Sequence, residues 1–258
     1  MNKNSVLNLL LTLALVFPVI ANSASFDCTK AGTRIEKLIC KDDDLSLMDE
    51  LLLKNYKEYL NSSSADNKSD IKKQQRLWLK ERNSSCDSLY QCIATYADRV
   101  KSIKKYTDTN TLIKELKTIK NANQLIWKNS FKNLRSDYFE GHRSKLVSRK
   151  AGLTSSEFRE LMSGTPQAYS DARDFITAMS CRHHSCDEKG VVAIDKINGQ
   201  LIFAALHFID ENGSTNINRP TLTFFYKNKS FLDITKPSII EMVKDIAKIE
   251  LITEVKLN

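Results

Sequence analysis

Two cysteines and two histidines lie within six residues of one another, in the segment Cys181–Cys186, which reads Cys-Arg-His-His-Ser-Cys. In an oxidising compartment the two thiols would close a short disulfide ring and hold the histidines on a stiff tip. A neutral imidazole donates a hydrogen bond from one ring nitrogen and accepts one at the other, so it can engage two carboxyl groups at once. We therefore expect this cysteine loop (residues 181–186) to bind a partner rather than to catalyse a reaction.

The cysteines and histidines of the loop could alternatively form a zinc site. Four ligands packed within six residues cannot easily surround one tetrahedral ion, because zinc sites draw their ligands from separated segments. The chain also lacks the G-x-S-x-G and H-E-x-x-H motifs of hydrolases. We expect no metal, no cofactor and no catalytic residue. An enzyme with a free nucleophilic thiol is the alternative, and it predicts thiols that titrate in the native protein.

The start of the chain predicts export. Lys3 is followed by a mostly apolar run over residues 6–21 and by the small residues Ala21, Ser23 and Ala24, which is the pattern of a secretory signal peptide. The run is short for a membrane span, and an uncleaved anchor is the alternative. All 6 cysteines lie beyond this segment, and an even number in an exported chain argues for disulfides. We expect a periplasmic protein without stable membrane insertion.

The positive charge of the chain is concentrated in its middle. The formal net charge is +8, but residues 25–100 are balanced and residues 151–258 carry a net charge of −2. Residues 101–150 hold 13 basic and 4 acidic side chains, a net charge of +9. Export argues against a nucleic-acid partner. Anionic wall polymers, lipid head groups and a solvated lysine-rich helix face are the interpretations left open.

Residues 26–106 have the periodicity of helices. Apolar side chains recur every three or four residues, which predicts helices at 33–40, from 44 to about 60, at 66–82 and after Cys86. Each apolar stripe needs a partner, so we expect a compact bundle. Cys28, Cys40, Cys86 and Cys92 would staple this bundle. Three pairings are possible, and we favour bonds across helices over local ones.

These residues also resemble a known family. The motifs are Phe26-x-Cys28, Glu36-x-x-Ile39-Cys40, Gln75-x-x-Trp78-Leu79-x-x-Arg82 and Cys86-x5-Cys92, with Tyr96 and Arg99 following. Together they resemble the LprI-type domain, a small exported helical module with four cysteines that is named for a lysozyme-inhibiting lipoprotein. The resemblance covers about residues 25–105 and implies an anchor or an inhibitory surface.

The second half of the chain predicts an α+β fold. Residues 107–111 have turn composition and predict a linker, and a basic helix follows it. A capping box at Thr154 and Glu157 predicts a helix that stops at Gly164. Strands are expected at 175–179, 191–194, 201–209 and 221–226, with a hairpin turn at Asn198-Gly199. Pro237 predicts a helix start. Residues 231–232 and 251–252 predict edge pieces of the sheet.

The predicted architecture is an N-terminal disulfide-stapled helical bundle plus a C-terminal antiparallel sheet with flanking helices. Its segments are a signal peptide (1–24), a helical domain (25–106), a basic helical connector (107–150) and an α+β domain (151–258).

The cysteine loop and its flanks resemble a second family. Phe175-x-x-x-Met179-Ser180 leads into the loop, and a valine-rich strand, a turn and Leu201-x-Phe203-Ala204-Ala205-Leu206 follow it. This arrangement is similar to the core of Ivy-type inhibitors of vertebrate lysozyme, whose hallmark is a C-x4-C loop with a central histidine. The resemblance implies that His184 is the inhibitory residue and that Arg182 stands where the family usually has lysine. His183 and Ser185 depart from the proline and aspartate that are usual there.

These observations together predict a periplasmic inhibitor of lysozyme that inserts the disulfide-closed loop into the active-site cleft. His184, His183, Arg182 and Ser185 are the expected target-binding residues, and Cys181 and Cys186 the expected disulfide. The expected partner is a c-type lysozyme or a related muralytic enzyme. The alternative is a binding or immunity protein against another cell-wall hydrolase, or an envelope stress protein. A monomer and a homodimer both remain open.

Overall fold

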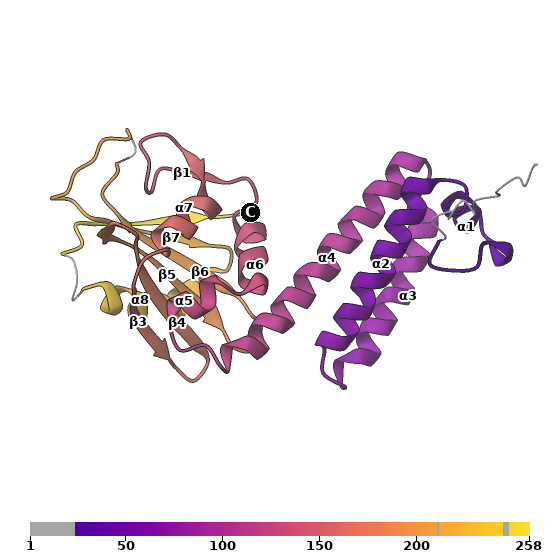
Figure 1. Cartoon of the computed structure of the whole chain (residues 1–258), viewed down its shortest axis with the longest axis horizontal. Coiled ribbons are helices and arrows are strands. Elements are labelled where there is room, and N and C mark those ends of the chain that lie inside the picture. The colour runs from indigo at the N-terminus through magenta and orange to yellow at the C-terminus, as the bar shows by residue number, and fades with distance from the viewer. Residues whose placement is uncertain (1–23, 211, 245–247) are drawn as a thin grey trace, which may run out of the picture.

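The computed structural model of the chain describes residues 24–210, 212–244 and 248–258, which form a helical bundle followed by an α+β domain (Figure 1). The predicted fold class is confirmed. Of the predicted signal peptide, residues 1–23 lie outside the described residues. No helix in the described part of the chain is both long and apolar enough to cross a membrane.

The bundle has three long helices, and a short helical turn and a short helix precede them (Figure 1). Thr33 and Glu36 form a capping box at the start of α1, which satisfies backbone N–H groups that the first turn leaves unpaired. The helices occur where the apolar periodicity predicts them. Their bounds are η1 (Cys28–Lys30), α1 (Arg34–Ile39), α2 (Asp43–Ser62), α3 (Asn67–Ser85) and α4 (Leu89–Leu116).

A buried aromatic side chain and its polar partners organise the middle of the bundle. The ring of Tyr96 is fully buried and meets Trp78 edge to face at 5.3 Å between ring centroids. Its hydroxyl donates to Asp49 Oδ1 at 2.8 Å and accepts from Arg82 Nη1 at 2.8 Å. These bonds satisfy two charged groups that burial would otherwise penalise.

The cysteines of the bundle pair locally, so our preference for bonds across helices was wrong. Cys28 bonds to Cys40 and Cys86 bonds to Cys92. Each bond closes around one short connection: the first joins η1 to the end of α1, and the second joins the end of α3 to the first turn of α4. The Cα atoms lie 5.8 Å and 4.6 Å apart, because these turns already fold the chain back on itself.

Helix α4 runs without interruption through residues 107–111, so the predicted linker is wrong. The hydroxyls of Thr107 and Thr109 donate to the carbonyls of Ile103 and Lys105 one turn earlier, which lets polar turn-type residues sit inside a helix. The first half of α4 packs in the bundle, while Leu112 and Leu116 join the core of the α+β domain. One helix therefore contributes to both cores and joins them without a flexible linker (Figure 1).

The α+β domain is built on a six-stranded sheet with the order β3-β4-β5-β6-β7-β8. Neighbouring strands are antiparallel except β7 and β8, which are parallel. The expected antiparallel sheet is therefore a mixed one, and β8 is the predicted edge piece at 251–252. The strand bounds are β3 (Pro166–Asp171), β4 (Phe175–Arg182), β5 (Ser185–Asp195), β6 (Leu201–His207), β7 (Thr221–Tyr226) and β8 (Leu251–Lys256).

Apolar cores lie on both faces of this sheet. Successive residues of β5 alternate between them: Val192 and Ile194 face one core, whereas Val191 and Ala193 face the other. The first core also receives residues from the end of α4 and from α5 (Ala122–Ile126), α6 (Asn129–Phe139) and α7 (Thr154–Leu161). The second is covered by α8 (Lys229–Lys244). A two-stranded sheet, β1 (Arg143–Ser144) and β2 (Gly152–Leu153), precedes α7.

Several local predictions for this domain need correction. Thr154 does not cap α7: its hydroxyl donates to Ser144, and Glu157 accepts from the backbone N–H of Leu146. The helix ends at Leu161 rather than at Gly164. Pro237 lies inside α8, and residues 231–232 belong to that helix rather than to the sheet.

The hairpin at Asn198-Gly199 is confirmed. Gly199 has a φ of 65° and lies against Thr109 of α4, where a Cβ atom would come within 2.5 Å of the threonine methyl. The turn therefore needs glycine both for its backbone conformation and for its close approach to α4.

Candidate functional site

The cysteine loop is the tip of the β4–β5 hairpin. Arg182 pairs with Ser185, so His183 and His184 alone make the turn. His184 has a φ of 64°, in the left-handed region that residues other than glycine rarely adopt. A left-handed conformation at a non-glycine residue costs about 1–2 kcal/mol and is maintained only where the surroundings impose it.

A disulfide and a register shift impose that conformation. Cys181 bonds to Cys186, with 4.7 Å between the two Cα atoms, and this confirms the expected ring. The ladder between β4 and β5 shifts register between Cys181 and Arg182, so residues 186–188 bulge out of the regular pairing. A bulge bends its strand and re-aims side chains, here those of Asp187 and Glu188.

The first strand of the hairpin is also held from behind by the segment that follows α7. The N–H of Gly164 donates to the Cys181 carbonyl at 2.8 Å, and the N–H of Cys181 donates to the Thr165 carbonyl at 3.2 Å. A Cβ atom on Gly164 would lie 2.7 Å from the Cys181 carbonyl oxygen, so this close contact requires glycine. The base of the loop is thus fixed on the side of β4.

A buried lysine holds the other end of the loop. Lys189 is only 2% exposed, and its ammonium donates to the carbonyl of Cys186. Burial lowers the pKa of Lys189, and the nearby carboxylate of Asp187 opposes that shift. Both cysteines therefore have a backbone carbonyl bound by a group outside the ring.

Arg182 faces its own domain. Its Nε donates to Glu160 Oε1 at 2.8 Å, and its Nη1 donates to Glu188 Oε2 at 2.7 Å. Burial alone would lower the pKa of this guanidinium, but the bonds to Glu188 and Glu160 outweigh it and raise the pKa above its ordinary value. Because two carboxylates occupy the guanidinium, Arg182 positions the loop in this structure.

The two histidines project from the loop. Both are exposed, and their ring centroids lie 3.8 Å apart with the planes tilted by 52°. Ser185 is half-buried at the start of β5. In the described residues no three His, Cys, Asp or Glu side chains are grouped so that they could hold a metal ion. The loop therefore offers a pair of adjacent imidazoles on a rigid support, which is suited to hydrogen bonding with acidic groups.

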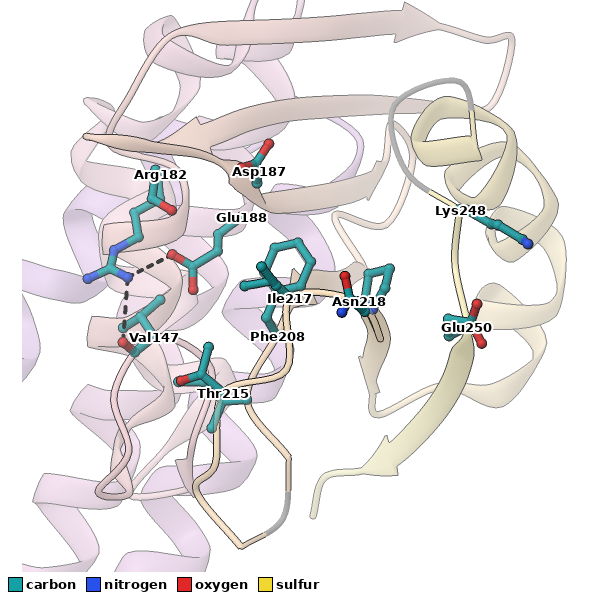
Figure 2. A pocket seen from close by; sticks show the side chains of 13 residues that line it. Val147, Arg182, Asp187, Glu188, Phe208, Thr215, Ile217, Asn218, Lys248 and Glu250 are labelled. Carbon is teal, nitrogen blue, oxygen red and sulfur yellow. Dashed lines mark hydrogen bonds and ion pairs between the residues drawn. The ribbon is translucent and has the colours of Figure 1, made fainter.

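A groove of about 670 Å³ opens beside the loop (Figure 2). Arg182 and Ser185 belong both to the loop and to the lining of the groove. Figure 2 shows the guanidinium of Arg182 between Glu188 and Val147, with Phe208 and Ile217 further along and Lys248 and Glu250 at the opposite side. Sequence reasoning missed this groove, because its walls come from segments distant in the chain.

The helical N-terminal part of the chain, about a third of its length, matches a known family. Its long helices, its two local disulfides and the buried network around Tyr96 extend to the end of α4. Residues 27–118 match the family model described as "Lysozyme inhibitor LprI". These residues form an LprI lysozyme inhibitor domain. It ends 12 residues beyond the predicted boundary at residue 106, just after the last turn of α4.

No curated protein and no solved structure matches the chain. The comparisons give no evidence for the expected Ivy-like domain in the C-terminal half, so that resemblance stays a prediction from the motif of the cysteine loop. The LprI domain makes lysozyme the expected target, and the family that matches is an inhibitor rather than an enzyme.

Proposed function

We propose that the protein is exported to the periplasm and inhibits a c-type lysozyme or a related muralytic enzyme by inserting the cysteine loop into the active-site cleft. In this proposal His184 makes the central contact, His183 and Ser185 assist it, and Arg182 holds the loop in place. The observation that carries the proposal is the exposed imidazole pair on a disulfide-closed turn, in a chain that also contains an LprI lysozyme inhibitor domain.

The chemistry of the target explains why an imidazole suits this role. A lysozyme works through two carboxyl groups that flank the scissile bond, one of them a protonated acid. A neutral imidazole accepts a hydrogen bond from the protonated group and donates one to the ionised group. It thereby occupies both catalytic groups and excludes the substrate.

Rigidity of the loop favours binding because ordering a mobile side chain on association costs about 0.5–1.5 kcal/mol. The cysteine loop avoids much of that cost, since a disulfide closes it and Gly164, Thr165 and Lys189 bind the backbone of its cysteines.

The test is inhibition of a c-type lysozyme digesting cell walls by the full mature chain. His184→Asn removes the imidazole but keeps a residue that tolerates a left-handed backbone. We expect this variant to inhibit at least about 10-fold less well, which corresponds to about 1.4 kcal/mol. Arg173→Ala is the matched control, because Arg173 precedes the opposite end of β4 and its side chain is 94% exposed.

Two results would redirect the proposal. Unchanged inhibition by His184→Asn would remove the loop from the mechanism and leave the LprI domain as the inhibitory surface. Inhibition of a different wall hydrolase, with no effect on lysozyme, would support an immunity protein that uses the same scaffold.

A further inference from the structure

The groove beside the cysteine loop carries more negative than positive charge. Three carboxylates line it, those of Asp187, Glu188 and Glu250, against the cations Arg182 and Lys248. A fourth carboxylate, Glu160, also binds Arg182 from outside the groove. Because Glu188 and Glu160 already bind Arg182, a partner would meet the exposed carboxylates of Asp187 and Glu250 and the exposed ammonium of Lys248, which together carry a net charge of −1.

The groove also has an apolar wall. Phe208, Ile209, Ile217 and Pro220 contribute to it, and the side chain of Ile217 is 75% exposed (Figure 2). An apolar wall with carboxylates at both ends is suited to a long basic side chain. The methylene stem of lysine or arginine packs against apolar atoms while its charged end reaches a carboxylate.

The groove is continuous with the loop rather than a separate feature. Ser185 is the first residue after the histidine turn, and Asp187 lies in the bulge that the disulfide closes. A protein that receives His184 in a cleft would therefore bring the rim of that cleft over the groove. Interactions between charged rims steer association and depend on ionic strength.

We infer that this groove binds basic side chains, lysine or arginine, on the rim of the target enzyme's cleft, with Asp187 and Glu250 at its two ends as their acceptors. This inference rests on the proposed function, since it takes the same enzyme as partner. It assigns opposite tasks to two neighbouring surfaces: the loop engages acidic groups inside the cleft, and the groove engages a basic group at its edge.

The test measures the affinity of the full mature chain for a c-type lysozyme at low and at physiological ionic strength. Asp187→Asn with Glu250→Gln removes two charges from the groove, and both residues are exposed, so folding should be unaffected. Asp174→Asn with Asp233→Asn removes the same charge elsewhere in the domain, where these side chains are 69% and 60% exposed. Circular dichroism melting curves verify that all variants are folded.

We expect the groove variant to bind at least 10-fold more weakly than the wild-type chain and to lose most of its dependence on salt, while the control stays within twofold. A groove variant within twofold of wild type, alongside a weakened His184→Asn variant, would overturn the groove and keep the loop.

If the wild-type chain does not bind lysozyme, the proposed function fails, and a labelled peptide of alternating arginine and leucine then tests the groove by fluorescence anisotropy. Peptide binding that the groove variant loses and the control keeps would support the groove. Absence of peptide binding to the wild-type chain would overturn it.

Discussion

The two halves of the molecule are stabilised by different interactions. The LprI domain is a thin bundle whose core includes a buried polar network, with Asp49 and Arg82 bound to Tyr96, and two disulfides at its connections. The α+β domain has a large apolar core on each face of its sheet and a single disulfide. That disulfide lies near the tip of a hairpin, and neither of its cysteines belongs to the two apolar cores.

The contrast indicates where each disulfide acts. A ring as small as that of Cys86–Cys92 or Cys181–Cys186 stabilises a whole domain by only about 2 kcal/mol on the loop-entropy model, and the longer Cys28–Cys40 ring by about 3 kcal/mol. In the bundle these contributions supplement a small core. In the α+β domain the apolar cores already stabilise the fold, so the Cys181–Cys186 bond serves local geometry. Helix α4 contributes side chains to the core of the bundle and to one core of the α+β domain, so it is the element through which the two halves would be coupled.

The largest expected effect is loss of an aromatic side chain from the core of the α+β domain. The ring of Phe203 is fully buried and lies about 5–6 Å, centroid to centroid, from those of Phe131, Tyr138, Phe139 and Phe158. Phe203→Ala should lower the free energy of unfolding by about 3–5 kcal/mol, because it removes apolar contacts and leaves a cavity. Denaturant unfolding measures this loss.

The unfolding of Phe203→Ala also tests whether α4 couples the stability of the bundle to that of the α+β domain. If α4 couples the halves, near-UV signals from Trp78 in the bundle and Trp127 in the α+β domain should shift together in Phe203→Ala. Separate transitions, with only the Trp127 signal shifted, would show that the halves unfold independently.

The second-largest expected effect is a loss of stability at low pH, which we assign to His207 in the α+β domain. All four histidines of the chain lie beyond residue 118. His207 is buried beside Thr223, with 2.9 Å between Nε2 and Oγ1, and burial lowers its pKa from 6.5 to about 4. The unfolded chain therefore binds a proton between pH 6.5 and 4 that the folded chain does not, so the free energy of unfolding falls as the pH is lowered through this range.

The total loss should be about 3 kcal/mol by pH 4, because a tenfold difference in proton affinity between the folded and unfolded chains corresponds to about 1.4 kcal/mol. Chemical denaturation at a series of pH values measures it. His207→Gln keeps a hydrogen-bonding side chain beside Thr223 but cannot be protonated, so most of the slope between pH 6.5 and 4 should disappear. An unchanged slope would assign it to other groups.

The sequence predicted those parts of the fold that depend on neighbouring residues. It did not predict those that depend on packing between residues far apart in the chain. The central strands follow from short continuous apolar runs, such as that within Leu201–His207, and the hairpin at Asn198-Gly199 follows from its turn residues, both local signals. The linker prediction failed because the side chains of Thr107 and Thr109 bond to the helix backbone, and packing of Leu112 holds α4 straight across that segment. Local composition contains no information about that packing.

The features of the candidate site also divide into those that the sequence predicted and those that depend on distant contacts. The ring between Cys181 and Cys186 follows from the spacing of two cysteines in an expected exported chain. The partners of Arg182 could not be foreseen in full, because Glu160 lies 22 residues earlier and meets it only through the packing of α7 against the sheet. The groove beside the loop depends on still more distant segments, since Val147 and Glu250 line the same space.

The smallest expected loss of stability comes from removing one short disulfide. Comparing this removal in each half tests which half carries the inhibitory surface. Cys181→Ser with Cys186→Ser and Cys86→Ser with Cys92→Ser each open a ring of six or seven residues, so each pair should cost about 2 kcal/mol. If the cysteine loop inserts into the target, only the first pair should weaken lysozyme inhibition, because it lets His184 leave its left-handed conformation. Thermal melting measures the stabilities and wall-lysis assays measure inhibition. Weaker inhibition from the second pair alone, at equal stability, would assign the inhibitory surface to the LprI domain.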